Sequence, residues 1–160
     1  MAEQKTNVMR LLEQKKIAYT AHSYPHGDEA VDGLTVAQIT GQDPAKVYKT
    51  LVAQGASKRI HVFVIPVAAE LDLKKAAKAA GEKSVVLVRV SELLGLTGYV
   101  RGGCSPVGMK KQYPTFFHSS IEGLDTVLVS AGKIGWQIEL ASADLIKLTR
   151  GRTADLTIED

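Results

Sequence analysis

The chain has 160 residues, of which 45% are hydrophobic and 23% charged, and these proportions are ordinary for a soluble globular protein. Its formal net charge of +3 is compatible with a polyanionic partner but does not require one. The single cysteine, Cys104, excludes an internal disulfide and fits a reducing compartment. No apolar run approaches the roughly 18 residues of a membrane span, and the N-terminus lacks an apolar signal region, so we expect a single cytoplasmic domain over residues 1–160.

The N-terminal part of the chain predicts short helices and one strand. Thr6 is placed to cap a helix whose apolar residues recur every three or four positions. Alternating side chains next predict a strand over residues 17–24, which the proline and glycine of residues 25–28 end. A short helix over 36–39 follows, and then a helical turn that begins at residues 43–44, an aspartate and a proline.

Two apolar runs in the middle of the chain, 47–54 and 59–66, predict a β-hairpin joined by residues 55–58. The second run is apolar on both faces, as in the central strand of a sheet. Asp72 then caps a helix that ends at Gly81, with leucine and alanine on its buried face and lysines on the other.

The remaining residues predict more strand than helix. Strands are expected over 85–90, 115–118, 126–130 and 136–140, and short helices over 91–96 and 143–148. The last two strands form a second hairpin, Ser142 is placed to cap the final helix, and the polar tail after Arg150 is expected to be loosely attached. Together the elements predict an α+β fold in which helices pack outside one mixed, curled, barrel-like sheet.

Lys49 is the first candidate for chemistry, because it shares a strand face with Val47 and Leu51. In a pocket, partial desolvation would favour its neutral amine, or an anionic or carbonyl ligand would pair with its ammonium. A lysine that protects an edge strand, or that extends along an apolar face to solvent, explains the same pattern. The pattern alone leaves both interpretations open.

The segment 101–111, which contains three glycines, one proline and three basic residues, is the second candidate. Glycine lets a ligand approach the main chain closely, so residues 102–106 could present backbone N–H groups to a developing oxyanion; a tight surface loop is the alternative. Cys104 would act as a nucleophile only beside a histidine, and the four histidines are dispersed without metal-ligand spacing. We therefore expect an inert Cys104 and no metal site.

Three further features have a functional and an ordinary interpretation. The hairpin tip 130–135 could approach a phosphate or ribose, although any such tip that needs positive φ has a similar composition. Tyr24 could stack on a ligand, although a half-buried tyrosine is common at a strand end, and Trp136 is expected in the core. Five lysines could follow a phosphate backbone or simply form a solvated face. They are Lys74, Lys75, Lys78, Lys110 and Lys111.

Five short motifs stand in a characteristic order over nearly the whole chain. They are Tyr24, residues 47–51, residues 71–75, residues 102–108 with 110–111, and residues 129–133 with 138–140. In this order they resemble the YbaK/EbsC family, in particular its Cys-tRNA(Pro) deacylase branch, which is related to the editing domain inserted in bacterial prolyl-tRNA synthetases.

This resemblance implies functional residues position by position. The family's essential lysine corresponds to Lys49 and its Gly-x-x-x-Pro loop to residues 102–106, so we expect Lys49, Gly102 and Gly103 to be catalytic. The expected substrate-binding residues are Tyr24, Thr50, Cys104, Ser105, Pro106, Ser130, Gly132 and Gln137. Gln137 stands where the best-known members carry an aspartate, so a neutral amide replaces a carboxylate and the amino-acid preference stays open.

The same resemblance implies an enzyme that hydrolyses mischarged aminoacyl-tRNA in trans, above all Cys-tRNA(Pro), with no metal or other cofactor. Its partners would be the tRNA acceptor end and, as a further candidate, prolyl-tRNA synthetase. The thiol of the substrate is thought to attack its own ester, so the protein need only hold this geometry and stabilise the oxyanion. Two alternatives remain: hydrolysis of another mischarged tRNA, such as Ala-tRNA(Pro), by water, and a non-catalytic module that binds tRNA ends or a synthetase.

Overall fold

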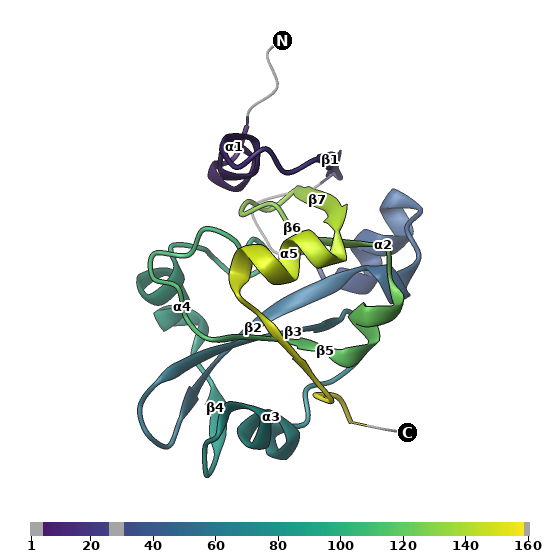
Figure 1. The fold of residues 1–160 in the computed structure, drawn as a ribbon. Coiled ribbons are helices and arrows are strands. Elements are labelled where there is room, and N and C mark those ends of the chain that lie inside the picture. Colours follow the sequence, from purple (N-terminus) through teal and green to yellow (C-terminus); the bar gives the residue numbers. More distant parts are fainter. Residues whose placement is uncertain (1–4, 26–30, 159–160) are drawn as a thin grey trace.

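The computed structural model describes residues 5–25 and 31–158, and Figure 1 shows how their helices surround the strands. The α-helices are α1 (Asn7–Gln14), α2 (Gly33–Thr40), α3 (Leu73–Ala80), α4 (Val90–Thr97) and α5 (Ser142–Thr149), and the short 3-10 helices are η1 (Pro44–Lys46) and η2 (Ser119–Gly123). The strands are β1 (Tyr19–Ser23), β2 (Tyr48–Gly55), β3 (Ile60–Pro66), β4 (Val85–Leu87), β5 (Thr115–His118), β6 (Thr126–Ser130), β7 (Trp136–Ala141) and β8 (Arg152–Ala154).

These strands form two sheets. One has the order β4-β2-β3-β5-β8, with antiparallel pairs among its first three strands and parallel pairs from β3 to β8. The other is antiparallel, with the order β1-β7-β6. An isolated parallel bridge between Val47 and Leu128 links the beginning of β2 to β6. The α+β class is therefore confirmed, with two adjoining sheets where one curled sheet was expected.

The central position of β3 explains why its sequence is apolar on both faces. Val62 and Val64 belong to the larger core, which lies between the two sheets and includes residues of α1. Phe63 and Ile65 belong to a second cluster on the opposite face, where the alanines of α3 pack. All four side chains are fully buried, so the prediction of a central strand is confirmed.

Local capping chemistry determines where most helices begin and end. Side-chain oxygens accept backbone N–H groups at the N-caps Thr6, Asp32, Asp43 and Asp72. Three helices end at glycines in the left-handed conformation, namely Gly41, Gly81 and Gly98. The helices predicted at the Thr6, Asp43 and Asp72 caps are therefore confirmed, whereas α2, capped by Asp32, begins three residues before the helix expected over 36–39.

Two further element boundaries differ from the prediction. Ser142 does not cap α5: β7 ends at Ala141 and α5 begins at Ser142, so the strand runs directly into the helix and Ala141 occupies the cap position without a side-chain acceptor. The strand expected over 85–90 ends at Leu87, because α4 already begins at Val90. The residues 25–28 that were expected to end the first strand lie, apart from Pro25, outside the described residues.

The C-terminal segment is firmly attached, contrary to expectation. β8 pairs in parallel with β5, and Leu156 is fully buried in the cluster beneath α3. The Leu156 N–H donates to His118 Nδ1 at 3.1 Å, and Lys75 pairs with Asp155 at 3.0 Å. One buried leucine, strand pairing and polar contacts with distant residues together hold this polar stretch, and local composition did not reveal these contacts.

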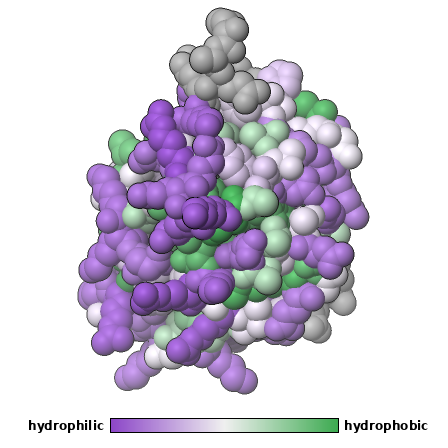
Figure 2. Space-filling model, turned by 45° about the horizontal axis from the view of Figure 1, so that its top comes forward, coloured by the Kyte–Doolittle hydropathy of each residue, from purple (hydrophilic) through white to green (hydrophobic). Residues whose placement is uncertain are grey.

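The surface is mostly hydrophilic, but its apolar residues are unevenly distributed. Figure 2 shows one face on which hydrophobic residues gather in a central patch surrounded by hydrophilic ones. Over residues 5–25 and 31–158, no helix combines the length and apolarity that crossing a membrane would need.

Candidate active site

A pocket of about 110 Å³ lies where the end of β1, the beginning of β2, the glycine-rich loop between α4 and β5, and the β6–β7 hairpin meet, with α2 as a further wall. The pocket brings together seven residues that the sequence predicted for the site. They are Tyr24, Lys49, Thr50, Gly102, Cys104, Ser130 and Gln137. These residues are far apart along the chain, so their convergence is a property of the fold.

Lys49 lies near the beginning of β2, opposite Ile65 of β3, and is half-buried. Burial lowers the pKa of its amine, while the negative charge of Glu70 acts in the opposite direction. Among the described residues, no group forms a hydrogen bond or ion pair with its ammonium. A partly desolvated and unpaired cation favours a ligand that presents an oxygen lone pair.

Two polar atoms of pocket residues are buried and have no hydrogen-bond partner in the described part of the chain. They are Thr50 Oγ1 and Gln137 Oε1. Gln137 is only 6% exposed and lies in β7 between His22 of β1 and Ser130 of β6. An unpaired buried polar group costs about 1–3 kcal/mol, so a ligand with N–H donors would relieve two such penalties here.

The glycine-rich loop forms one wall of the pocket through close backbone packing. Gly102 has a φ of 85°, and the N–H of Gly103 donates to the Val100 carbonyl at 3.0 Å. A Cβ at Gly103 would lie 3.1 Å from the backbone nitrogen of Ile134, so this glycine allows the loop to pack against the tip of the β6–β7 hairpin. Gly103 therefore joins the two glycine-rich segments and does not itself line the pocket.

Three other predicted site residues also lie outside the pocket lining. Ser105 is fully buried, and its hydroxyl accepts the Val107 N–H at 3.2 Å. Pro106 lines a separate pocket beside α1 and the end of α5. Gly132 has a φ of 90°, and a Cβ there would lie 2.9 Å from the ring of Tyr99. None of the three therefore lines the pocket in which substrate binding was expected.

Residues 29–148 match the family described as Aminoacyl-tRNA editing domain. The chain belongs to this family. A protein of Enterococcus faecalis (strain ATCC 700802 / V583), named as a candidate Cys-tRNA(Pro)/Cys-tRNA(Cys) deacylase, EbsC, is 42% identical over 158 residues, which are 99% of this chain and 96% of that protein. The predicted resemblance to the YbaK/EbsC family is therefore confirmed.

Solved structures share the fold of this editing domain. The crystal structure of a candidate trans-editing enzyme for prolyl tRNA synthetase has a TM-score of 0.84 and 23% identity, and covers 98% of this chain and 100% of that chain. A scaffold protein for computationally grafted epitopes also has a TM-score of 0.84, with 24% identity and 96% of each chain covered. At such identities the likeness concerns the fold alone.

The thiol of Cys104 is buried and protonated, although this residue lines the pocket. It is 8% exposed, and burial raises the pKa of its thiol to about 12, with a hydrogen bond from Thr97 acting in the opposite direction. The thiol is therefore protonated at neutral pH, whereas the thiolate is the nucleophilic form of cysteine. This state supports the expectation that Cys104 is not the nucleophile.

The pocket also contains residues that the sequence did not single out for the site. They are Val31, Gly33, Val36, Tyr48 and Val67. A Cβ at Gly33 would lie 2.4 Å from Val67 Cγ1, so glycine at the beginning of α2 allows this helix to approach the end of β3. Tyr48 is nearly buried and pairs with Ser120 Oγ at 2.5 Å. Only the glycine directly after the Asp32 cap was a local signal; the apolar residues resemble ordinary core.

The lysines considered for phosphate binding divide into two groups. Lys75 is structural, because it donates to the Thr157 carbonyl at 2.8 Å and pairs with Asp155. The other four lysines are exposed, on α3 and after the glycine-rich loop. Trp136 is partly buried against the main core, as expected.

Proposed function

We propose that this editing domain is an aminoacyl-tRNA deacylase whose main substrate is Cys-tRNA(Pro), bound by its acceptor end. The observation that carries the proposal is the half-buried ammonium of Lys49, which has no hydrogen-bond or ion-pair partner among residues 5–25 and 31–158, in a small pocket where Thr50 Oγ1 and Gln137 Oε1 also have none among these residues. The name of the Enterococcus faecalis relative, a candidate Cys-tRNA(Pro)/Cys-tRNA(Cys) deacylase, supports the choice of substrate. We call this pocket the acyl pocket.

The polar groups of the acyl pocket complement those of an aminoacyl ester. The substrate's α-ammonium carries three N–H donors, of which Gln137 Oε1 and Thr50 Oγ1 accept two. The ester carbonyl oxygen accepts a charge-assisted hydrogen bond from Lys49, and Gly102 and Cys104 of the glycine-rich loop, which line the same pocket, would supply backbone N–H donors. The pocket volume of about 110 Å³ admits a small side chain such as that of cysteine.

A cysteinyl ester supplies its own nucleophile. The substrate sulfur attacks the ester carbon, so a C–S bond forms and the C–O bond to the terminal ribose breaks. The thiol proton passes to the departing ribose oxygen, and the products are free tRNA and a cyclic thiolactone. The protein holds thiol and carbonyl in attack geometry and stabilises the oxyanion, so the protonated Cys104 has no chemical part in the reaction.

A panel of esters on one proline tRNA tests this function. The purified protein is incubated with tRNA charged in turn with cysteine, alanine, serine and proline, and release of the amino acid is followed. We expect cysteine to be released much faster than serine, which has the same shape but no thiol. Equal rates for cysteine and alanine would instead favour attack by water, and no release from any ester would contradict the proposal.

We also propose that prolyl-tRNA synthetase supplies much of the tRNA selectivity. The net charge of +3 gives this chain a modest electrostatic attraction for tRNA, and such attraction does not distinguish sequences. Release of cysteine from several tRNAs is therefore expected to be similar for the isolated chain and to become selective when the synthetase is added. A strong preference by the isolated chain would contradict this proposal, and synthetase binding without any ester hydrolysis would favour a regulatory module.

A further inference from the structure

A second pocket of about 280 Å³ adjoins the acyl pocket and shares Thr50, Gly102 and Cys104 with it. Its other walls come from β2, from β4 and the residue that follows it, from α4, and from the glycine-rich loop. They are Leu51, Val52, Leu87, Val88, Val90, Leu93 and Arg101. We call this pocket the β4–α4 groove.

The β4–α4 groove combines apolar walls with one cation. Five of the nine large hydrophobic residues that are exposed in the described chain lie between positions 86 and 100, and two of these, Leu87 and Val90, line the groove with 48% and 60% exposure. Exposed apolar residues that cluster in this way mark a binding surface. Arg101 is exposed and lines the same groove, so its guanidinium is available to an anion.

We propose that the β4–α4 groove binds the terminal nucleoside of the tRNA, with the base against Leu87 and Val90 and the attached phosphate on Arg101. This inference rests on the proposed function. A heterocyclic base has an apolar face that packs on such side chains, and the phosphate beside it carries the charge that arginine binds as a planar donor pair.

The position of the groove identifies the nucleoside as the occupant. In an aminoacyl-tRNA the amino acid and the terminal base are joined to the same ribose, so their binding sites must meet at the scissile ester. The two pockets meet at Thr50, Gly102 and Cys104. Lys49 and Gln137, whose ammonium and Oε1 have no partner in the described chain, line only the smaller pocket, and the larger one is mostly apolar, which assigns the acyl group to the first and the base to the second.

The contribution of the nucleoside to kcat/KM can be measured with three small esters. They are cysteine methyl ester, 3′-O-cysteinyl adenosine, and the same adenosine ester with a 5′-phosphate. For the wild-type chain, kcat/KM is expected to rise at each step. Leu87→Asp should lower the ratio of kcat/KM for the adenosine ester to that for the methyl ester by about tenfold, a typical loss for one base contact. Val86→Asp is the matched control, because Val86 is the preceding residue of β4, is 61% exposed and does not line the groove; its ratio should equal that of the wild type.

Arg101→Ala should lower the advantage of the 5′-phosphate ester over the unphosphorylated adenosine ester, because it removes the phosphate partner. Val90→Asp, with Leu94→Asp as its control on the same helix, repeats the base test if Leu87→Asp does not fold. A wild-type ratio near one, or ratios that both groove variants leave unchanged, overturns the inference. A sedimentation coefficient that falls in Leu87→Asp while the ratio is unchanged assigns the groove to a second copy of the chain and also overturns it.

If the wild-type chain hydrolyses neither these esters nor Cys-tRNA(Pro), the proposed function fails, and binding of adenosine 5′-monophosphate still tests the groove. Saturation-transfer NMR should then detect the nucleotide on the wild type and on Val86→Asp but not on Leu87→Asp. No binding to the wild type, or equal binding to all three proteins, overturns the inference.

Discussion

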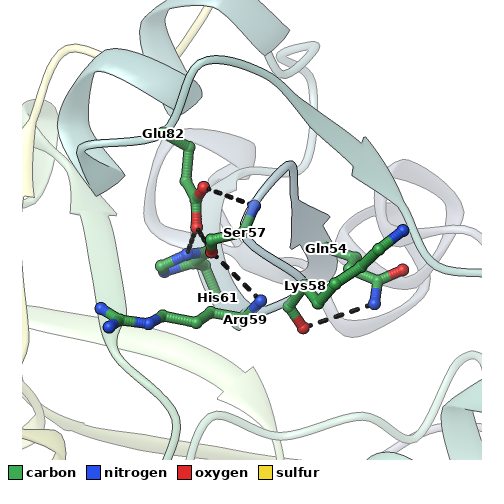
Figure 3. A network of polar contacts seen from close by, with 6 residues as sticks. All are labelled: Gln54, Ser57, Lys58, Arg59, His61 and Glu82. Carbon is green, nitrogen blue, oxygen red and sulfur yellow. Dashed lines mark hydrogen bonds and ion pairs between the residues drawn. The ribbon is translucent and has the colours of Figure 1, made fainter.

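The two ends of the β2–β3 hairpin differ in whether their buried polar side chains have partners within the protein. At the turn, Ser57 and His61 each form a hydrogen bond with the carboxylate of Glu82, as Figure 3 shows. At the other end, Lys49 and Thr50 of β2 face the acyl pocket without a partner among the described residues. The first arrangement satisfies its charge within the protein, and the second leaves binding capacity for a ligand.

The cluster at the turn is centred on the carboxylate of Glu82, whose side chain is 6% exposed. It accepts the Ser57 hydroxyl at 2.5 Å, the Ser57 N–H at 3.1 Å and His61 Nε2 at 2.8 Å (Figure 3). The hydrogen bond from the Ser57 hydroxyl, followed by that from His61, lowers the pKa of Glu82 to about 2. Ser57 donates to the carboxylate and not to the histidine, so these three residue types form a structural tie and not a catalytic relay.

Removing the unpaired cation is expected to have the largest effect. Lys49→Ala should lower kcat/KM for Cys-tRNA(Pro) by at least a hundredfold, the loss typical of one missing oxyanion donor. The fold should survive, because Lys49 makes no hydrogen bond or ion pair with the described residues. Deacylation and circular dichroism check both parts, and Lys78→Ala on the exposed face of α3 is the control for lost positive charge. A folded Lys49→Ala variant with wild-type turnover would falsify the role of this residue.

Gln137→Leu, which removes one unpartnered acceptor of the acyl pocket, is expected to have an intermediate effect. It should lower kcat/KM for Cys-tRNA(Pro) roughly tenfold, since a hydrogen bond to a charged group contributes about 1.5–3 kcal/mol. For N-acetyl-Cys-tRNA(Pro), which has no ammonium, wild type and variant should be nearly equal. An equal loss on both substrates would show that Gln137 acts on something other than the ammonium.

The cluster at the turn should respond in stability and not in catalysis. The folded-state pKa of Glu82 is about 2 and its ordinary value is 4.5, so its stabilising effect is complete above pH 4.5 and is lost as the pH falls towards 2. Glu82→Gln should therefore lower the thermal midpoint at pH 7, and the gap from wild type should close between pH 4.5 and 2. Thermal unfolding across this range measures the gap; a gap that stays constant would refute the assignment, and turnover per folded molecule should be unchanged.

Cys104→Ser is expected to have the smallest effect. The buried thiol has a pKa of about 12, so replacing it should leave most deacylation intact. Single-turnover release of cysteine from Cys-tRNA(Pro) is the appropriate measurement. Complete loss in a folded variant would mean that an enzyme thiol takes part in the chemistry.

The sequence predicted those elements well whose bounds and burial depend on neighbouring residues. Asp72 and Gly81 directly flank the helix α3 that they delimit, and the apolar residues of β3 show that both of its faces are buried. The prediction failed where distant contacts decide. Ser142 does not cap α5, because β7 continues directly into the helix. Leu156 is held by β5 and α3, which precede it by many residues.

The residues predicted for the candidate site likewise fall into those that line the acyl pocket and those that do not. The motif order predicted the family and named seven residues that line the acyl pocket, but Gly103, Ser105, Pro106 and Gly132 do not line it. Whether a glycine lines a pocket or packs against a neighbouring loop depends on contacts across the chain. Close packing of Gly103 on the backbone at Ile134 is such a contact.

The sequence by itself determined the α+β class, most element positions and the family, because caps, periodicity and motifs can be read along the chain. Its choice of Lys49 as the catalytic residue stays a prediction. Only the tertiary structure decided which polar groups have partners. Glu82 meets Ser57 and His61, while Thr50 and Gln137 meet none in the described chain, and both outcomes depend on side chains brought together from distant positions. The difference between a structural carboxylate and a ligand-binding pocket therefore arises only when the chain is folded.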